Sequence, residues 1–393
     1  MQKKVGIITM YYKSTNYGGN LQAYALSYIL KQNGYDAEQI CFLTSSLKKE
    51  SSFIKLKKLF LWGIKPAFSK IISKVKHYKK SSEKTQNKKD EKLIQEQVKL
   101  RNKAFENFNQ EIIPHSSNVY YADTITNSLA NYDAFITGSD QVWNLKWYHP
   151  IYFLDFVPNN KIKLSYAASI SAKFLSKKEK RVITKSLKSF DAISVREKSD
   201  EENLESSKLK NIETVLDPTL LLTQNDWNKV CKDIEEESEY VFCYFLGKNE
   251  EAKNIAINFA KDKKLKLIAF VYPGEKNYAD ENIFCAPPEE FLGYIKKAAY
   301  VFTDSFHATV FSYLYKKQFY VFNRNKSGNM NSRILNITDI FNLKERFCDE
   351  QRENLEYINS LKPIDYSNEN KKLTSLIEKS KLFLFEALQG KHG

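Results

Sequence analysis

The sequence predicts an α/β protein with two domains, each built on a parallel sheet. Strand-like apolar runs alternate with helical patterns in two separate stretches, and 393 residues exceed what one hydrophobic core usually supports. Hydrophobic residues make up 42% of the chain, which is ample for two cores. Ligands in such folds bind beyond the carboxyl ends of the strands. We therefore expect the turns after the strands to meet in one cleft.

The first alternation begins at the N-terminus. Residues 5–12 predict a strand, "NYGGNLQAYAL" (16–26) a turn and a helix that runs to about Gln32, and Gly34 lies just beyond that helix. A second strand begins at "YDAEQICFL". The pattern continues in "YDAFITGSDQVWN" (132–144), "IKLSYAASI" (162–170) and "FDAISVRE" (190–197). These runs are typical of a doubly wound sheet.

The second alternation opens at "YVFCYFLG" (240–247). A helix over 249–263, the strand "KLKLIAFVY", a helix over 288–298, the strand "AYVFTDSFH", a helix from about Ala308 and the strand "QFYVFNR" (318–324) follow. We assign residues 1–190 to the first domain and 191–365 to the second.

The net charge of +14 is concentrated in a basic insertion at about 46–105. Residues 48–103 hold 18 Lys and Arg against five Asp and Glu, with Phe and Trp between them. One interpretation is a surface that touches an anionic membrane, and the other is a solvated helical insertion packed by its apolar stripe. No recognisable nucleic-acid module accompanies the charge, so we expect no nucleic-acid partner.

The five cysteines are scattered and odd in number, which argues against a disulfide framework and a zinc site. The N-terminus has no signal-peptide pattern, and no apolar run is long enough to cross a bilayer. We therefore expect a cytoplasmic protein, in one interpretation peripheral on the inner membrane face. No oligomeric state is predicted.

The turn "NYGGN" suits an anion. Its glycines allow close approach of backbone N–H groups, and the helix that follows offers its positive end to a phosphate or carboxylate. It lacks both the P-loop and the dinucleotide pattern, and an ordinary strand-to-helix turn is the alternative. The candidate cleft residues here are Asn16, Gly18, Gly19 and Asn20.

The turn "TGSDQVWN" occupies the same position in its own strand-helix unit. Ser139 could hold a polar ligand, Asp140 could accept from a sugar hydroxyl, and Trp143 could stack on a sugar face. Asp140 is equally suited to cap the next helix.

His307 follows a predicted strand end, with Asp304 and Ser305 beside it. We expect its imidazole at the mouth of the cleft, although a lone histidine is more often structural. The stretch "RNKSGNMNSRI" (324–334) carries Arg324 and Arg333, whose guanidinium groups match carboxylate or phosphate, and its alternative is a solvated basic loop.

These motifs, in this order, resemble the polysaccharide pyruvyl transferase family. The resemblance rests on "NYGGNLQAYAL", "DAFITGSDQVWN", "KLSYAASI", "AISVREKS", "VLDPTLLL" and "TDSFHATVFSYLYKKQFYVF" followed by "NSRI", and it spans roughly residues 1–345. Each motif alone would be weak evidence, whereas six in register are specific.

The resemblance implies a GT-B-like fold, with two Rossmann-like domains whose parallel sheets face each other across a cleft. It also implies that a C-terminal helix within 366–393 crosses back to the first domain. In the family, phosphoenolpyruvate donates a pyruvyl group to sugar hydroxyls of a cell-surface polysaccharide precursor, typically as a cyclic ketal. The acceptor is often carried on a polyprenyl lipid at the cytoplasmic membrane face, where the basic insertion would hold the enzyme.

Family members are similar in carrying a histidine at His307 and an arginine at Arg196, both near the donor. Many read Arg-Leu-His where this chain has Ser305-Phe306-His307, so Arg324 or Arg333 would supply the lost charge. The implied donor-binding set is Arg196, Ser305, Arg324, Asn331, Ser332 and Arg333.

Under this interpretation His307 transfers protons and Asp304 orients it, while Asp140 or Asn16 holds the acceptor sugar. The scheme requires no metal and no cofactor besides phosphoenolpyruvate as donor substrate. The alternatives are a nucleotide-sugar-dependent glycosyltransferase of the same architecture and a catalytically silent protein that binds polysaccharide or membrane.

Overall fold

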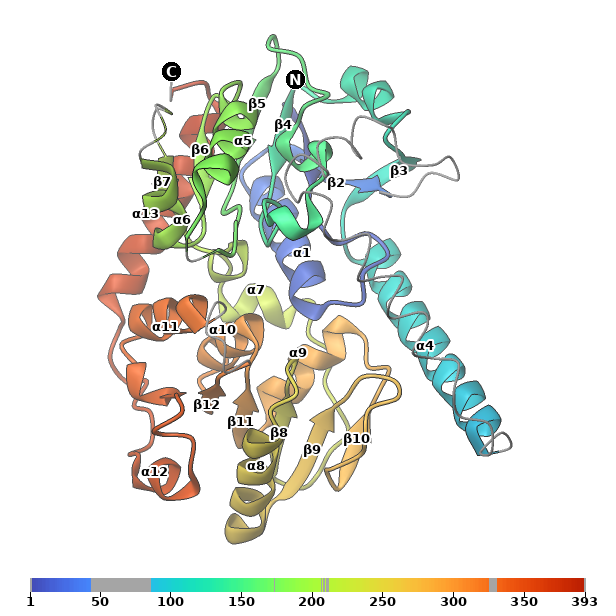
Figure 1. Cartoon of the computed structure of the whole chain (residues 1–393), viewed down its shortest axis with the longest axis vertical. Helices are drawn as coiled ribbons and strands as arrows, with labels where there is room; N and C mark the ends of the chain where they lie inside the picture. The colour runs from blue at the N-terminus through green and yellow to red at the C-terminus, as the bar shows by residue number, and fades with distance from the viewer. Residues whose placement is uncertain are drawn as a thin grey trace.

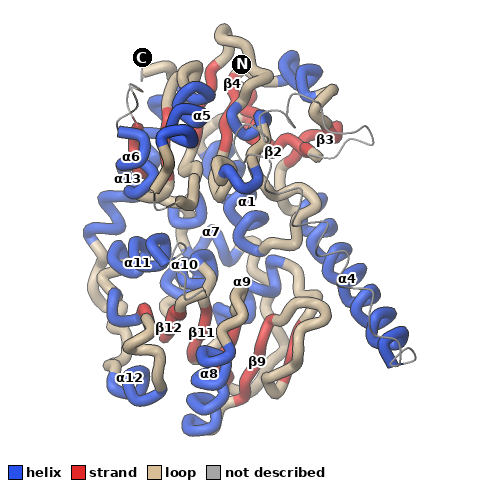
Figure 2. Tube along the Cα trace, viewed as in Figure 1, coloured by secondary structure: helices blue, strands red, loops and turns tan. Residues whose placement is uncertain are grey.

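Two parallel β-sheets lie one above the other in the computed structural model of the chain (Figure 1). The structure describes residues 2–43, 86–172, 174–205, 207, 209, 212–324 and 331–391. Helices surround both sheets, and loops connect the two halves (Figure 2). The predicted α/β class with two Rossmann-like halves is confirmed.

The first sheet has the order β3-β2-β1-β4-β5, with every neighbouring pair parallel. Its strands are β1 (Lys4–Ile8), β2 (Asp36–Phe42), β3 (His115–Tyr120), β4 (Ala134–Thr137) and β5 (Ile162–Ser165). Val5, Ile7 and Ile8 are fully buried. An almost continuous apolar strand is typical of a parallel sheet that is covered on both faces.

The second sheet has the order β10-β9-β8-β11-β12-β13, again with parallel neighbours. Its strands are β8 (Tyr240–Tyr244), β9 (Lys266–Phe270), β10 (Glu281–Ile283), β11 (Tyr300–Thr303), β12 (Gln318–Phe322) and β13 (Phe347–Cys348).

A short parallel pair continues the first sheet. Strands β6 (Ile193–Val195) and β7 (Ile212–Thr214) pair with each other. Isolated bridges from Ala192 to Leu164 and from Val195 to Ala168 join them to the end of β5. The boundary predicted at 190/191 therefore falls before two strands that lie with the first sheet, and the change to the second sheet occurs between Thr214 and Tyr240.

The α-helices are α1 (Tyr17–Gln32), α4 (Gln86–Glu111), α5 (Lys177–Leu187), α6 (Lys198–Glu205), α7 (Gln224–Asn228), α8 (Glu250–Lys263), α9 (Pro288–Lys297), α10 (Phe306–Leu314), α11 (Asn331–Ile340), α12 (Leu355–Ser360) and α13 (Lys371–Leu388). The 3₁₀ turns are η1 (Ile125–Asn131), η2 (Leu145–Trp147), η3 (Pro150–Phe153), η4 (Pro218–Leu220) and η5 (Lys344–Arg346). Of the helices in the described ranges, none is both long enough and apolar enough to span a bilayer.

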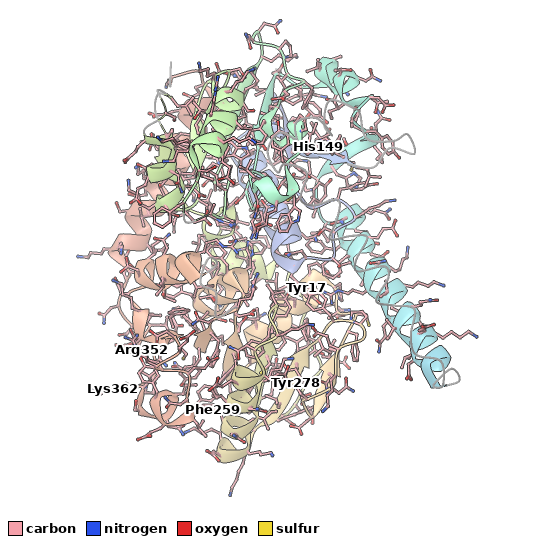
Figure 3. All side chains as sticks on the ribbon, in the orientation of Figure 1. Tyr17, His149, Phe259, Tyr278, Arg352 and Lys362 are labelled. Carbon is pink, nitrogen blue, oxygen red and sulfur yellow. The ribbon has the colours of Figure 1, made fainter. Side chains whose placement is uncertain are left out.

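Helix α1 follows the predicted boundaries closely. Asn16 caps its N-terminus by accepting from Gly19 N, and Gly34 lies beyond its end with a φ of 84°. Tyr17 lies between the two halves (Figure 3). Its ring stacks on Phe291 at 4.4 Å, and its hydroxyl donates to Ala286 O at 2.7 Å. The start of α1 is therefore fixed against the second half.

Of the basic insertion predicted at 46–105, residues 46–85 lie outside the described residues. Residues 86–105 belong to α4, which projects at one side of the molecule (Figure 1). Arg101 of α4 donates to Thr15 O at 3.1 Å and to Phe284 O at 3.0 Å. Helix α4 is thereby tied to both halves.

The C-terminal helix α13 packs on the first half. Lys3 Nζ donates to Leu388 O at 2.7 Å, and Leu216 N donates to Ser380 Oγ at 2.9 Å. Residues 366–370 precede the helix, so the chain returns from the second half to the first before it ends (Figure 1).

Candidate active site

A cavity of about 620 Å³ opens between the two halves. Its walls come from the segments after β1, β4 and β5 in the first half and after β8, β11 and β12 in the second. The carboxyl ends of both sheets thus face one shared space, as predicted from the positions of the turns.

His307 lies in the first turn of α10, on the wall of this cavity. The imidazole packs over Gly18 so closely that a Cβ at position 18 would overlap its Nδ1 atom. This contact explains one glycine of the "NYGGN" turn. Gly18 is needed there because the histidine of the other half occupies the space that a side chain would fill.

Asp217 faces the other edge of the imidazole. Its Oδ2 lies 3.6 Å from His307 Nε2, and the same oxygen accepts from Arg196 Nη1 at 2.9 Å and from Ser139 Oγ at 3.1 Å. Its Oδ1 accepts from Thr219 N at 3.0 Å and from the Thr219 hydroxyl at 2.8 Å. A single buried carboxylate therefore joins both halves of the site.

Electrostatics keep Asp217 ionised. Burial opposes its charge, but His307, Arg196 and the Thr219 N–H outweigh burial and hold the pKa of the carboxyl far below its usual range. Burial also opposes the charge of Arg196, yet Glu197 and Asp217 raise the pKa of this guanidinium above its ordinary value. A fixed negative charge beside His307 results.

Arg196 lies behind the cavity. Its guanidinium is 2.9 Å from Glu197 Oε1 and lies over the Phe306 ring at 4.9 Å from the ring centroid. Arg196 is 4% exposed and lines a small recess behind the large cavity. Its charge is matched by carboxylates. Arg196 was expected to contact the donor directly, but it is not among the residues that line the large cavity.

Asp304 does not orient His307, contrary to the expectation from their closeness in sequence. Its carboxylate accepts from Leu246 N and Gly247 N, each at 2.7 Å. Burial raises the pKa of Asp304, although Arg324 and these N–H groups oppose the shift. Its role is to tie the end of β11 to the end of β8, and Asp217 occupies the position expected for Asp304.

Arg333 and Arg324 supply positive charge to the cavity wall. Within the described part of the chain, no carboxylate oxygen lies within 4.0 Å of the Arg333 guanidinium, which is 7% exposed. With its amide oxygen turned toward Arg333, Gln141 accepts from Nη1 and Nη2 at 2.9 and 3.0 Å. Burial and the neighbouring Arg196 lower the pKa of Arg333 to about 10, so it remains a cation at neutral pH.

Arg324 approaches the site from the end of β12. Its Nη2 donates to Asp304 O at 3.2 Å, and its Nε lies 3.8 Å from Asp304 Oδ2. Both arginines expected to replace the missing one at Ser305 therefore reach the cavity. Ser305 itself lines the cavity and caps α10, where its Oγ accepts from Ala308 N.

The residues expected at the first glycine turn divide into two groups. Asn16 and Gly18 line the cavity. Asn20 is fully buried and donates to Ser14 O and Asn16 O, and Gly19 N is used by the Asn16 cap. Asn20 and Gly19 therefore belong to the first turn of α1, and neither is among the residues that line the cavity.

Three residues were predicted at the second turn. Asp140 lines the cavity, with Oδ1 3.6 Å from Arg196 Nη2. Ser139 is buried and supports Asp217. Trp143 was expected to stack on a sugar, but it is fully buried, stacks on Phe153 and donates to Tyr152 O at 2.9 Å. The stacking role predicted for Trp143 is wrong, because its indole belongs to the core.

The loop over 325–330 lies outside the described residues, as do the side chains of Asn331 and Ser332 at the start of α11. Their predicted donor contacts stay predictions. Within the described part of the chain, no group of three or more His, Cys, Asp and Glu side chains is placed to hold a metal ion.

Sequence reasoning missed two residues of this site, Asp217 and Trp147. Asp217 stands in the quoted motif "VLDPTLLL", where an acid directly after a strand was a usable signal. Trp147 lines the cavity and is 56% exposed. It lies four positions after Trp143, and the sequence alone does not show which indole faces outward.

The model of the family described as polysaccharide pyruvyl transferase matches residues 16–326, which is most of the chain. The chain belongs to the polysaccharide pyruvyl transferase family. The match includes Gly18, Asp217 and His307, which the structure brings together. No curated protein matches the chain.

Several solved structures are similar to the chain at low sequence identity. UDP-GlcNAc 2-epimerase of Methanocaldococcus jannaschii is 11% identical, with a TM-score of 0.46 over 97% of this chain and 100% of that one. MurG of Acinetobacter baumannii is 10% identical, with a TM-score of 0.40 over 99% and 94%. UGT89C1 of Arabidopsis thaliana is 10% identical, with a TM-score of 0.46 over the whole of both chains.

Proposed function

We propose that this polysaccharide pyruvyl transferase takes its pyruvyl group from phosphoenolpyruvate and joins it to two hydroxyls of a sugar as a cyclic ketal. The observation that carries the proposal is the convergence of His307, Arg324 and Arg333 on one cavity between the sheets. Phosphoenolpyruvate is small and carries a phosphate and a carboxylate. A buried guanidinium without a carboxylate partner is suited to such an anion.

The donor site draws on both halves of the molecule. Arg333 and Arg324 face the anionic groups, and the N-termini of α10 and α1 reach the same wall through Ser305 and Asn16. Arg196 acts indirectly. It donates a hydrogen bond to the Asp217 carboxylate, and that carboxylate faces His307. This division supports a donor pocket without a P-loop lysine.

The reaction has two steps at C2 of the donor, an addition followed by a substitution. In the first, a sugar oxygen bonds to C2 while C3 gains a proton from His307, and the proton of that hydroxyl returns to the imidazole. In the second, another hydroxyl oxygen of the same sugar attacks C2, the bond from C2 to the phosphate oxygen breaks, and the second hydroxyl proton leaves with phosphate. The ionised Asp217 carboxylate lies beside the ring, with Oδ2 3.6 Å from Nε2.

Binding measurements distinguish this donor from a nucleotide sugar. We expect phosphoenolpyruvate to raise the thermal unfolding midpoint of the full chain, since a ligand that binds only the folded state stabilises it. UDP and GDP are expected to leave it unchanged. A shift with UDP or GDP and none with phosphoenolpyruvate would instead favour a glycosyltransferase, and a shift with none of the three would favour a silent binding protein.

A further inference from the structure

We infer that Trp147 is the surface on which the acceptor sugar packs, an inference that rests on the proposed function. Three tryptophans lie in the described part of the chain. Trp143 and Trp227 are fully buried, whereas Trp147 is 56% exposed and lines the interdomain cavity. An exposed indole on a concave wall is an unused apolar surface, and pockets for organic ligands are lined by such groups.

The backbone of Trp147 lies in a defined turn. Trp147 ends the 3₁₀ turn η2, which Asn144 caps by accepting from Lys146 N at 3.0 Å. Lys146 and Trp147 are exposed, whereas the residues on either side of them, Leu145 and Tyr148, are 7% and 1% exposed. Because its flanking residues are anchored in the core, Trp147 projects outward from a fixed turn and presents a preformed surface.

The chemistry of the cavity differs between its two sides. His307, Arg324 and Arg333 gather on the side of the second half, which suits the anionic donor. The side of the first half offers Trp147 together with the carboxylate of Asp140 and the amides of Gln141 and Asn144.

A neutral hexopyranose matches the second set. One face of its ring carries C–H groups that cover an aromatic ring, and its hydroxyls pair with carboxylate and amide groups at the edge. A sugar on Trp147 would lie in the same cavity as the donor. The geometry therefore places the acceptor against Trp147 on the first-half side of the cavity, and the anionic groups of the donor beside Arg324 and Arg333.

The test compares Trp147→Ala, Trp147→Phe and, as a distant control, Leu382→Ala, whose side chain is 57% exposed on α13. The probes are methyl β-galactoside, methyl α-mannoside and methyl N-acetyl-β-glucosaminide, observed by saturation-transfer NMR with the full chain. We expect at least one glycoside to receive saturation from the wild type. We expect Trp147→Ala to weaken that binding about tenfold, as truncation of a central aromatic contact does. Trp147→Phe should retain most of the binding, and Leu382→Ala should equal the wild type.

Phosphoenolpyruvate binding, measured on the same samples, separates the two proposals. An unchanged donor affinity in Trp147→Ala, with acceptor binding lost, supports the assignment. Equal glycoside binding in Trp147→Ala and the wild type would overturn it, and so would the absence of binding of all three glycosides to the wild type. If the wild type binds a glycoside but not phosphoenolpyruvate, the proposed donor is wrong while the acceptor surface stands.

Discussion

Replacing His307 by Ala is expected to lower kcat for pyruvyl transfer by about 10²- to 10⁴-fold, the range that a positioned acid-base group contributes. The imidazole lines the cavity, and Asp217 Oδ2 lies 3.6 Å from its Nε2. Phosphoenolpyruvate should still bind, because Arg324 and Arg333 are intact. Steady-state phosphate release at saturating donor, together with calorimetric donor binding, measures both effects.

Gly18→Ala provides a matched perturbation that leaves His307 in the sequence. The added Cβ would overlap Nδ1 of the imidazole, so we expect the ring to move. As in His307→Ala, kcat should then fall. Gly34→Ala is the control, because no atom lies within 4 Å of a Cβ placed there and the position is remote from the cavity. Its left-handed φ of 84° should cost some stability but leave kcat unchanged. Wild-type turnover in either His307→Ala or Gly18→Ala would contradict the assigned role.

Replacing Arg333 by Ala should raise the Kd for phosphoenolpyruvate by about 30-fold or more, since truncating one side of a buried charge-assisted contact costs about 2 kcal/mol or more. The guanidinium is 7% exposed and lacks a carboxylate partner within 4.0 Å in the described residues. An anionic ligand would supply the negative charge that pairs with this guanidinium. Isothermal titration of phosphoenolpyruvate into each variant gives the Kd directly.

Two further variants sharpen the Arg333 result. Arg333→Lys keeps the charge but loses the planar pair of donors, so we expect an intermediate Kd. Arg352→Ala removes an arginine near α12 (Figure 3) that is not among the residues lining the cavity, and this variant should bind the donor as the wild type does. A wild-type Kd in Arg333→Ala would remove this residue from the donor site.

The fold was accessible from the sequence because each strand of these parallel sheets is a short, nearly continuous apolar run that ends in a polar turn. The C-terminal boundary of α1 followed from Gly34, which acts locally as a terminator. The placement of β6 and β7 depended instead on bridges to Leu164 and Ala168. Such pairing between strands leaves no signal in the local sequence. The domain boundary was therefore predicted at 190/191, before β6 and β7, although both strands lie with the first sheet.

The candidate site was predictable in its position and only partly in its contacts. Turns after parallel strands had to converge, which placed His307, Arg324 and Arg333 on one cavity. Asp304 was paired with His307 because the two are close in sequence, yet a side chain at the end of β11 points to the neighbouring β8. The actual partner, Asp217, lies 90 residues away from His307 in the chain and is brought to it by the meeting of the two halves.

The most direct test of the central claim follows the carbon that would be transferred. Phosphoenolpyruvate labelled with ¹³C at C2 is incubated with the wild type and the glycosides, and the label is observed by NMR while inorganic phosphate is measured. We expect the labelled carbon to become a quaternary ketal carbon bonded to two sugar oxygens, with one phosphate released per ketal and neither event in His307→Ala. Release of phosphate with free pyruvate as the sole labelled product, or a ketal formed equally well by His307→Ala, would contradict it.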